Sequence, residues 1–298
     1  MPDAFDITAP AGFALTSWRG LAFCHPLDWE VAGLSVLGET GQCVLVDRRF
    51  QRLQITWQTP KGVPDLPRMY EDLRKSPVKE GQPAAPATAL KGIPDWTGAV
   101  RQDEAGTMVF AGRHFPAENL LVQAAIVWPS QRDPRIDRAL LDSVTPWPAK
   151  APTVLWQALG LSARVPSDFE LIESSSLVGR VVWEFRQKSK PHTGLLIERI
   201  AMVSHWLKGT LEDWLPGTLP EGYRMTGGAA PIALGRHEGV EAIAWHGSMM
   251  DRLRRVVTWR RERAWHCPQQ QRVYRIGVWR RGHEPPDPPD GLRVRCCE

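Results

Sequence analysis

The sequence lacks the long apolar runs that mark membrane and secreted proteins. Its longest apolar stretch, Leu120 to Trp128, is interrupted by Gln123 and is far shorter than the roughly 20 residues that a membrane-spanning helix needs. The N-terminal residues, Met1 to Ala14, are mixed and do not join a basic head to an apolar run. We therefore expect a cytoplasmic protein with no signal peptide and no membrane span.

Signature motifs of large enzyme classes are also missing. There is no Walker A sequence, no Gly-x-Gly-x-x-Gly loop and no Gly-x-Ser-x-Gly elbow, which would indicate phosphate binding, dinucleotide binding or a nucleophilic serine. His237-Glu238 and His246 do not have the four-residue histidine spacing of a zinc protease. The sequence therefore predicts no catalytic residues, no cofactor and a protein that is not an enzyme.

Cysteines are few, odd in number and without a Cys-x-x-Cys pair, which argues against a disulfide framework and for a reducing compartment. His266-Cys267 together with Cys296 and Cys297 would gather soft ligands if the end of the chain packed on the preceding strands. That spacing matches no known metal motif, and free cysteine is commonly buried. We expect buried structural thiols and no metal site.

What the chain does contain is an internal echo. Residues 20–31 read Gly-Leu-x4-Pro-x-Asp-Trp-Glu-Val, and residues 160–171 read Gly-Leu-x4-Pro-x-Asp-Phe-Glu-Leu. Further matches follow in the same order, up to Phe115-Pro116 against Cys267-Pro268, with an offset that only grows, as expected if loops absorbed small insertions. The echo predicts an internal duplication into two tandem repeat domains, residues 1–150 and 151–298.

Each copy reads as strands with a few helices. Val, Ile and aromatic-rich segments predict strands, and helices are expected near Leu66–Lys75 and Leu207–Leu215. The first copy should close with a helix from Pro134 to Val144, capped by Asp133, whereas the second ends in a truncated equivalent. We expect an α+β fold, an antiparallel sheet with helices packed on it.

The entry motif resembles that of the Mog1/PsbP-like fold. The residues that carry the resemblance are Pro26, Trp29 and Val31, and in the second copy Pro166, Phe169 and Leu171. Members of that group are mostly binding or assembly factors. The resemblance therefore implies two tandem Mog1/PsbP-like domains with a role in protein binding.

Positive charge is concentrated at the end of the chain. From Arg252 onward there are twelve arginines against five acidic residues, a formal charge of +7, whereas the whole chain carries +4. Strand alternation predicts one face of arginines and tryptophans, the candidate partner-binding residues Arg255, Trp259, Arg261, Arg275, Trp279 and Arg281. Guanidinium groups beside aromatic rings suit phosphates, stacked bases or an acidic protein, and equally a plain solvated face on which arginine stems pack over rings.

The leading hypothesis is a non-catalytic binding or assembly protein, an adaptor acting through protein–protein contacts. One alternative is an accessory protein that binds nucleic acid through the Arg/Trp face. Another is an enzyme with an unrecognised site at the junction of the two repeats.

Overall fold

A computed structural model describes residues 7–75, 87–248, 250–251 and 257–297 of the chain. The chain divides into two compact units: residues 1–151 with 156–158, and residues 152–155 with 159–298. Strands hold 53 % of the residues and helices 12 %, and the strands pair in three antiparallel sheets. The predicted α+β class, with helices packed on a sheet, is therefore wrong, because the molecule is predominantly β.

The helical content is lower than expected because the described residues of the second unit contain no long helix. Instead of one helix over 207–215 it has two four-residue helices, α3 (Val203–Trp206) and α4 (Leu211–Trp214), followed by the 3-10 turn η1 (Leu215–Thr218). Thr210 and Asp213 form a capping box, in which the side chain of each accepts a hydrogen bond from the backbone N–H of the other. A new helix, α4, therefore begins after Thr210 and does not continue α3. Where a closing helix was expected in truncated form, the second unit has the short strand β21 (Arg293–Arg295).

Both helices expected in the first unit are present. Helix α1 covers Leu66–Lys75, and α2 covers Pro134–Ser143. Asp133 caps α2 by accepting a hydrogen bond from the backbone N–H of Arg135, as predicted.

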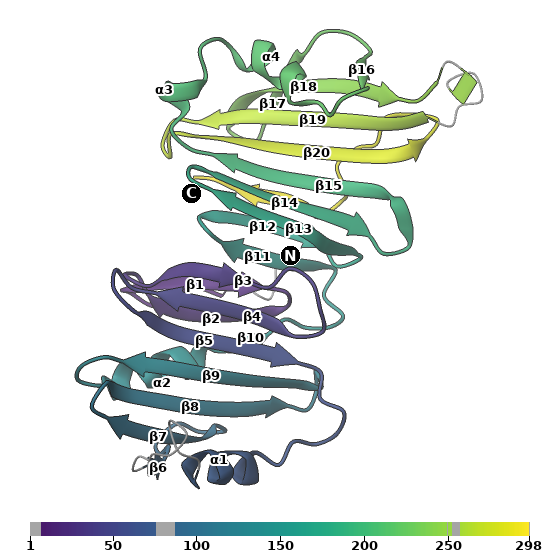
Figure 1. Cartoon of the computed structure of the whole chain (residues 1–298). Helices are drawn as coiled ribbons and strands as arrows, with labels where there is room; N and C mark the ends of the chain where they lie inside the picture. The colour runs from purple at the N-terminus through teal and green to yellow at the C-terminus, as the bar shows by residue number, and fades with distance from the viewer. Residues whose placement is uncertain (1–6, 76–86, 249, 252–256, 298) are drawn as a thin grey trace. The chain divides into compact units, whose positions relative to one another are not determined.

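The first unit is built on a seven-stranded sheet in the order β3-β4-β5-β9-β8-β7-β6 (Figure 1). Its strands are β3 (Glu30–Leu34), β4 (Gly41–Val46), β5 (Gln51–Gln58), β6 (Ala87–Ala89), β7 (Thr97–Asp103), β8 (Gly106–Phe115) and β9 (Leu120–Trp128). The shorter strands β1 (Phe13–Trp18), β2 (Leu21–Pro26) and β10 (Thr145–Pro146) also pair in this unit. Alternate residues of β4 and β5, such as Leu45, Leu53 and Ile55, are fully buried, which is the period expected of strands with one face in the core.

The second unit follows the same strand path in its eight-stranded sheet, β13-β14-β15-β20-β19-β18-β16, with β17 also paired to β18 (Figure 1). Its strands are β11 (Thr153–Ala158), β12 (Leu161–Pro166), β13 (Phe169–Leu177), β14 (Arg180–Gln187), β15 (Lys190–Ile200), β16 (Arg224–Met225), β17 (Ala230–Leu234), β18 (His237–His246), β19 (Val257–Cys267) and β20 (Arg272–Gly282). In both sheets the fourth strand of the order is the one that comes last in the sequence among that sheet's strands, β9 in the first unit and β20 in the second. Duplication itself stays a prediction.

The glycine of the repeated Gly-Leu pair lies in a tight hairpin turn in both units. Gly20 (φ +81°) and Gly160 (φ +70°) each occupy the second position of a two-residue hairpin turn, after Arg19 (φ 47°) and Leu159 (φ 55°). Two consecutive positive φ values define the turn whose twist matches that of paired strands, and glycine adopts such a φ at little cost. The motif therefore specifies a hairpin.

No helix among the described residues is long and apolar enough to cross a membrane.

Candidate functional site

The structure does not bring the six candidate residues onto one face. Arg255 lies outside the described residues. In the β19–β20 ladder Trp259 is opposite Arg280 and Arg261 is opposite Val278, whereas Trp279 is opposite Arg260. Because directly opposed residues share a face of the sheet, Trp259 and Arg261 lie on one side and Arg275 and Trp279 on the other. The single Arg/Trp face is therefore a wrong prediction.

Arg275 is buried rather than presented to a partner, with 4 % of its surface exposed. Its guanidinium bonds Glu262 (Nε to Oε2, 2.9 Å) and Glu198 (Nη1 to Oε2, 2.8 Å), and both carboxylates are fully buried. Arg260 also pairs with Glu262, and Arg180 with Glu198, so three arginines share two carboxylates. These carboxylates raise the pKa of Arg275 against the lowering effect of its burial. Arg275 is a structural residue of the second unit.

Arg261 is also neutralised within the fold. It contacts both oxygens of the Glu241 carboxylate at 3.1 Å, and its Nε donates to the carbonyl oxygen of Pro286 at 2.8 Å. Arg263 pairs with the same carboxylate at 2.7 Å. Arg260, Arg261, Arg263 and Arg275 are therefore all neutralised by carboxylates of the same unit.

Arg281 remains available at the surface. It is exposed and lines a cavity of about 570 Å³ between the start of β15 and the end of β20. The polar side chains of this basic cavity are those of Lys190, His192, Thr193, Arg280, Arg281 and His283. Among the described residues, the cationic side chains that line this cavity form one ion pair, the long contact between Arg280 and Glu284 at 3.8 Å. This arrangement suits an anionic group.

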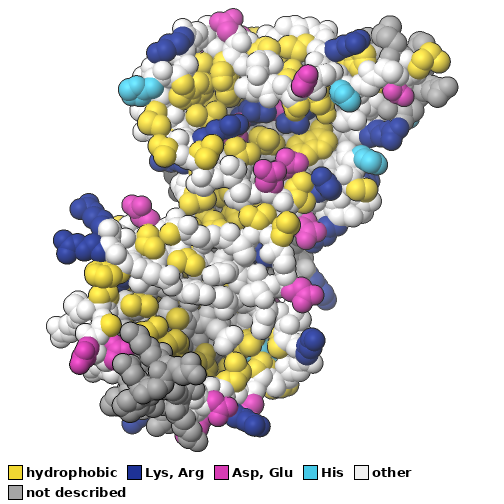
Figure 2. Space-filling model, in the orientation of Figure 1, with side chains coloured by type: hydrophobic (Ala, Val, Ile, Leu, Met, Phe, Trp, Pro, Cys, Tyr) yellow, Lys and Arg dark blue, Asp and Glu magenta, His cyan; other side chains and the backbone are white. Residues whose placement is uncertain are grey.

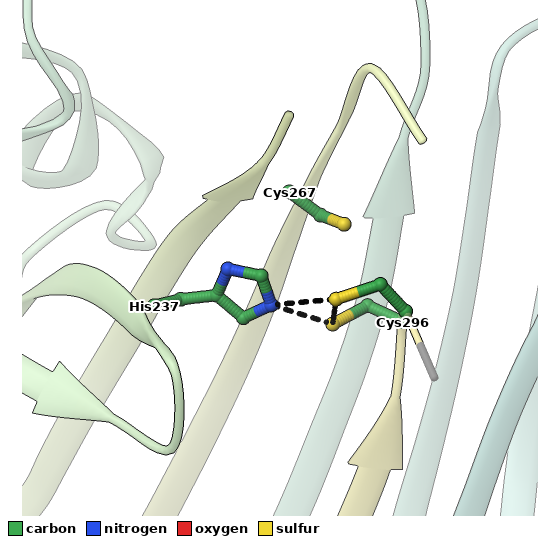
Figure 3. A group of neighbouring side chains, drawn as sticks. His237, Cys267 and Cys296 are labelled. Carbon is green, nitrogen blue, oxygen red and sulfur yellow. Dashed lines mark hydrogen bonds between the residues drawn. The ribbon is translucent and has the colours of Figure 1, made fainter. Parts of the chain in front are cut away.

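A second cluster joins His237 to three cysteines (Figure 3). The Nε2 of His237 lies 3.0 Å from the sulfur of Cys296 and 3.2 Å from that of Cys297, and the two sulfurs are 3.8 Å apart. Together with Cys267, the four potential ligand atoms lie within 4.8 Å of one another. Cys267 is fully buried and the other three are half-buried.

Three pieces of chain deliver these side chains to one place. His237 begins β18 directly after the hairpin turn at Gly235, and Cys267 ends β19. Gly239 is paired with Trp265, so two residues further along the same ladder His237 reaches the level of Cys267. Cys296 and Cys297 follow β21, which pairs with β12 through Arg295 opposite Ser162.

The surroundings of the Cys297 thiol disfavour its ionisation. Burial, together with the neighbouring sulfurs of Cys267 and Cys296, raises the pKa of the Cys297 thiol to about 11. Several thiolates so close together require a cation to offset their charge.

The sequence places Cys267, Cys296 and Cys297 together only if the chain end packs on the strands, and it points to His266 as their neighbour; the structure has His237 there instead. His266 precedes Cys267 and therefore points to the opposite face of β19. His237 appears in the sequence analysis only beside His246. Its position at the start of a strand, directly after the β17–β18 hairpin turn, indicates that it lies at the end of the sheet where β19 ends with Cys267.

Comparisons with known proteins give little. No protein-family model and no curated protein matches the chain. Among solved structures, the apo immunity protein TplEi of the T6SS from Pseudomonas aeruginosa aligns over 96 % of this chain and 98 % of its own, with 10 % identity and a TM-score of 0.33. Similarity this low supports no conclusion, and the resemblance to Mog1/PsbP-like domains stays a prediction.

Proposed function

We propose that the chain is a non-catalytic binding protein that recognises an acidic segment of a protein partner through the basic cavity of its second unit. The observation that carries this proposal is the convergence of Lys190, Arg280 and Arg281, with His192 and His283, around a hollow of about 570 Å³. A hollow of that size accepts one or two side chains, and arginines bind carboxylates with paired, directed hydrogen bonds.

The distribution of charge favours an acidic protein over a nucleic acid. A nucleic-acid backbone needs cationic side chains repeated along its path. Of the arginines in β19 and β20, Arg260, Arg261, Arg263 and Arg275 are held by carboxylates of the same unit. On the face drawn in Figure 2, acidic and basic side chains are interspersed and form no continuous stripe.

The test uses the full chain as bait in a lysate of the native host, in three forms: wild type, Arg281→Glu and Arg138→Glu. Arg138 is a matched control, because it is an exposed arginine on α2 of the first unit. We expect an acidic protein to be retained by wild type and R138E and at least about tenfold less by R281E, a loss of about 1.4 kcal/mol of binding. Nuclease treatment should not change this result.

Two outcomes would refute the proposal. One is the absence of any protein whose retention depends on Arg281. The other is retention that disappears with nuclease and falls steeply with salt, which would support the alternative of a nucleic-acid-binding accessory protein.

A further inference from the structure

We propose that His237, Cys267, Cys296 and Cys297 bind one zinc ion in a closed, structural site of the second unit. This proposal is independent of the basic cavity. It rests on the geometry of the four ligand atoms, on their chemistry and on the place of the cluster in the fold.

Figure 3 shows the side chains of His237, Cys267 and Cys296 converging on one place, and three of the four ligand atoms are spaced nearly as a tetrahedral metal site requires. Zinc–sulfur bonds of about 2.3 Å place two thiolates about 3.8 Å apart, and a zinc–nitrogen bond of about 2.0 Å places the imidazole about 3.5 Å from each sulfur. The observed separations are 3.8 Å between the sulfurs of Cys296 and Cys297, and 3.0 and 3.2 Å from these sulfurs to Nε2 of His237. Cys267 lies within 4.8 Å of these three ligand atoms, so its sulfur has to move by no more than about 1 Å to complete the tetrahedron.

The donor set selects the metal. Thiolates and an imidazole bind zinc strongly, whereas magnesium and calcium prefer oxygen ligands. All four donor atoms lie within 4.8 Å, so they converge on a single ion and are too close to hold separate irons of a cluster. Three thiolates, a neutral imidazole and Zn²⁺ leave one net negative charge, and the positively charged Arg272 is the residue opposite Cys267 in the β19–β20 ladder.

Four protein ligands leave no open position for water or substrate, which is the pattern of structural rather than catalytic zinc. The ion would join β18, β19 and the end of the chain, and His237 and Cys296 are 59 residues apart. The last strand, β21, has only three residues, and β12 is its one partner among the strands that the structure describes. A strand this short gains little stability from its own hydrogen bonds, so the metal would anchor it.

A disulfide is the competing use of these thiols, and the histidine separates the two explanations. A disulfide would bond Cys267 to Cys296 or Cys297 and would not need His237. Zinc requires all four side chains. His237→Gln is therefore the decisive variant, because it leaves every thiol in place.

The experiment measures metal in the full chain purified under reducing conditions. We expect about one zinc per chain by mass spectrometry, and cobalt substitution should give the intense absorption of tetrahedral thiolate coordination. His237→Gln and Cys267→Ser should weaken zinc binding, measured against a chromophoric chelator, by more than the roughly 10–100-fold that loss of an outer partner of a metal ligand costs. The controls His266→Gln and Cys43→Ser should bind zinc as wild type does. Cys43 is fully buried in β4 of the first unit, and His266 adjoins Cys267 on the opposite face of the strand.

A second measurement needs no variant and so does not depend on any substituted chain folding. Chelator treatment of the wild-type protein should lower its melting temperature, and zinc but not magnesium should restore it. The proposal is overturned if the reduced wild-type chain takes up no stoichiometric zinc, or if H237Q binds zinc as wild type does. It also fails if thiol counting of the freshly purified protein finds Cys267 in a disulfide.

Discussion

Glu262→Gln tests whether the buried ionic network holds the second unit together. The Glu262 carboxylate is fully buried and accepts hydrogen bonds from Arg260 and Arg275. Glutamine has the same shape, but it carries no charge and presents one amide N–H₂ to a guanidinium. Arg260 and Arg275 are 7 % and 4 % exposed, so E262Q removes a carboxylate from two buried guanidinium groups and leaves Arg275 paired with Glu198.

The expected cost follows from the burial of these charges. Removing one partner of a buried ion pair destabilises a protein by about 3–5 kcal/mol, because the remaining charge stays desolvated. For a unit of this size, each kcal/mol lowers the melting temperature by about 2–4 °C, so E262Q should lower it by roughly 6–20 °C. Arg275→Met should cost less, because Glu198 keeps Arg180 and Glu262 keeps Arg260.

Urea unfolding followed by tryptophan fluorescence gives the free energy of unfolding for each variant. The control is Asp142→Asn, which makes the same chemical change in the Arg138–Asp142 pair, whose side chains are 60 % and 44 % exposed. Exposed pairs contribute about 0–1 kcal/mol, so D142N should be nearly neutral. If E262Q also lies within about 1 kcal/mol of wild type, or if R275M costs more than E262Q, the reasoning from buried charge is wrong.

Two further predictions concern the first unit. Burial lowers the pKa of His25, whose ring contacts Thr16 and the carbonyl oxygen of Pro26, so the unfolded chain takes up the proton first. The free energy of unfolding should therefore fall as the pH drops below about 6.5; His25→Gln should reduce this dependence in urea titrations at pH 7.5 and 5.5, and the exposed His192→Gln should not. Gly20→Ala should cost about 1 kcal/mol by thermal unfolding, because a Cβ there meets no atom within 4 Å but φ is +81°. Gly62 has equally open space and no such φ, so an equal loss in Gly62→Ala would contradict the conformational explanation.

The sequence predicts secondary structure correctly where a helix, a cap or a strand is determined by residues close together in the chain. The helix at Leu66–Lys75, the cap at Asp133 and the strands around Cys43 and Ile55 each follow from a short pattern of side chains. The predicted α+β class is wrong because strands hold 53 % of the residues and helices 12 %, and over 207–215 the chain forms no single helix, since a new short helix starts after Thr210.

Features that depend on distant partners could not be read from the sequence. Arg275 precedes the apolar Ile276 in β20, and such an alternation of a polar and an apolar residue in a strand is typical of an exposed arginine. Its partners Glu198 and Glu262 lie on β15 and β19, and they reach Arg275 only because these strands flank β20 in the sheet. His237 likewise meets Cys267 only because β18 and β19 are neighbours in a given register. A shift of one residue would move either side chain to the other face.

The two units close their chains by different physical means. In the first, β10 pairs with β2, and the preceding helix α2 buries Leu140 and Leu141 completely. In the second, β21 pairs with β12, the corresponding second strand of its unit, but the described residues 257–297 contain no helix before it. Burying two leucines is worth about 3–6 kcal/mol, and a three-residue strand supplies no comparable apolar surface. Zinc held by His237 and three cysteines would replace this missing apolar anchor, which explains why the cysteines gather at the end of the second unit. Chelation should therefore release the last residues of the chain to proteolysis while the first unit stays protected.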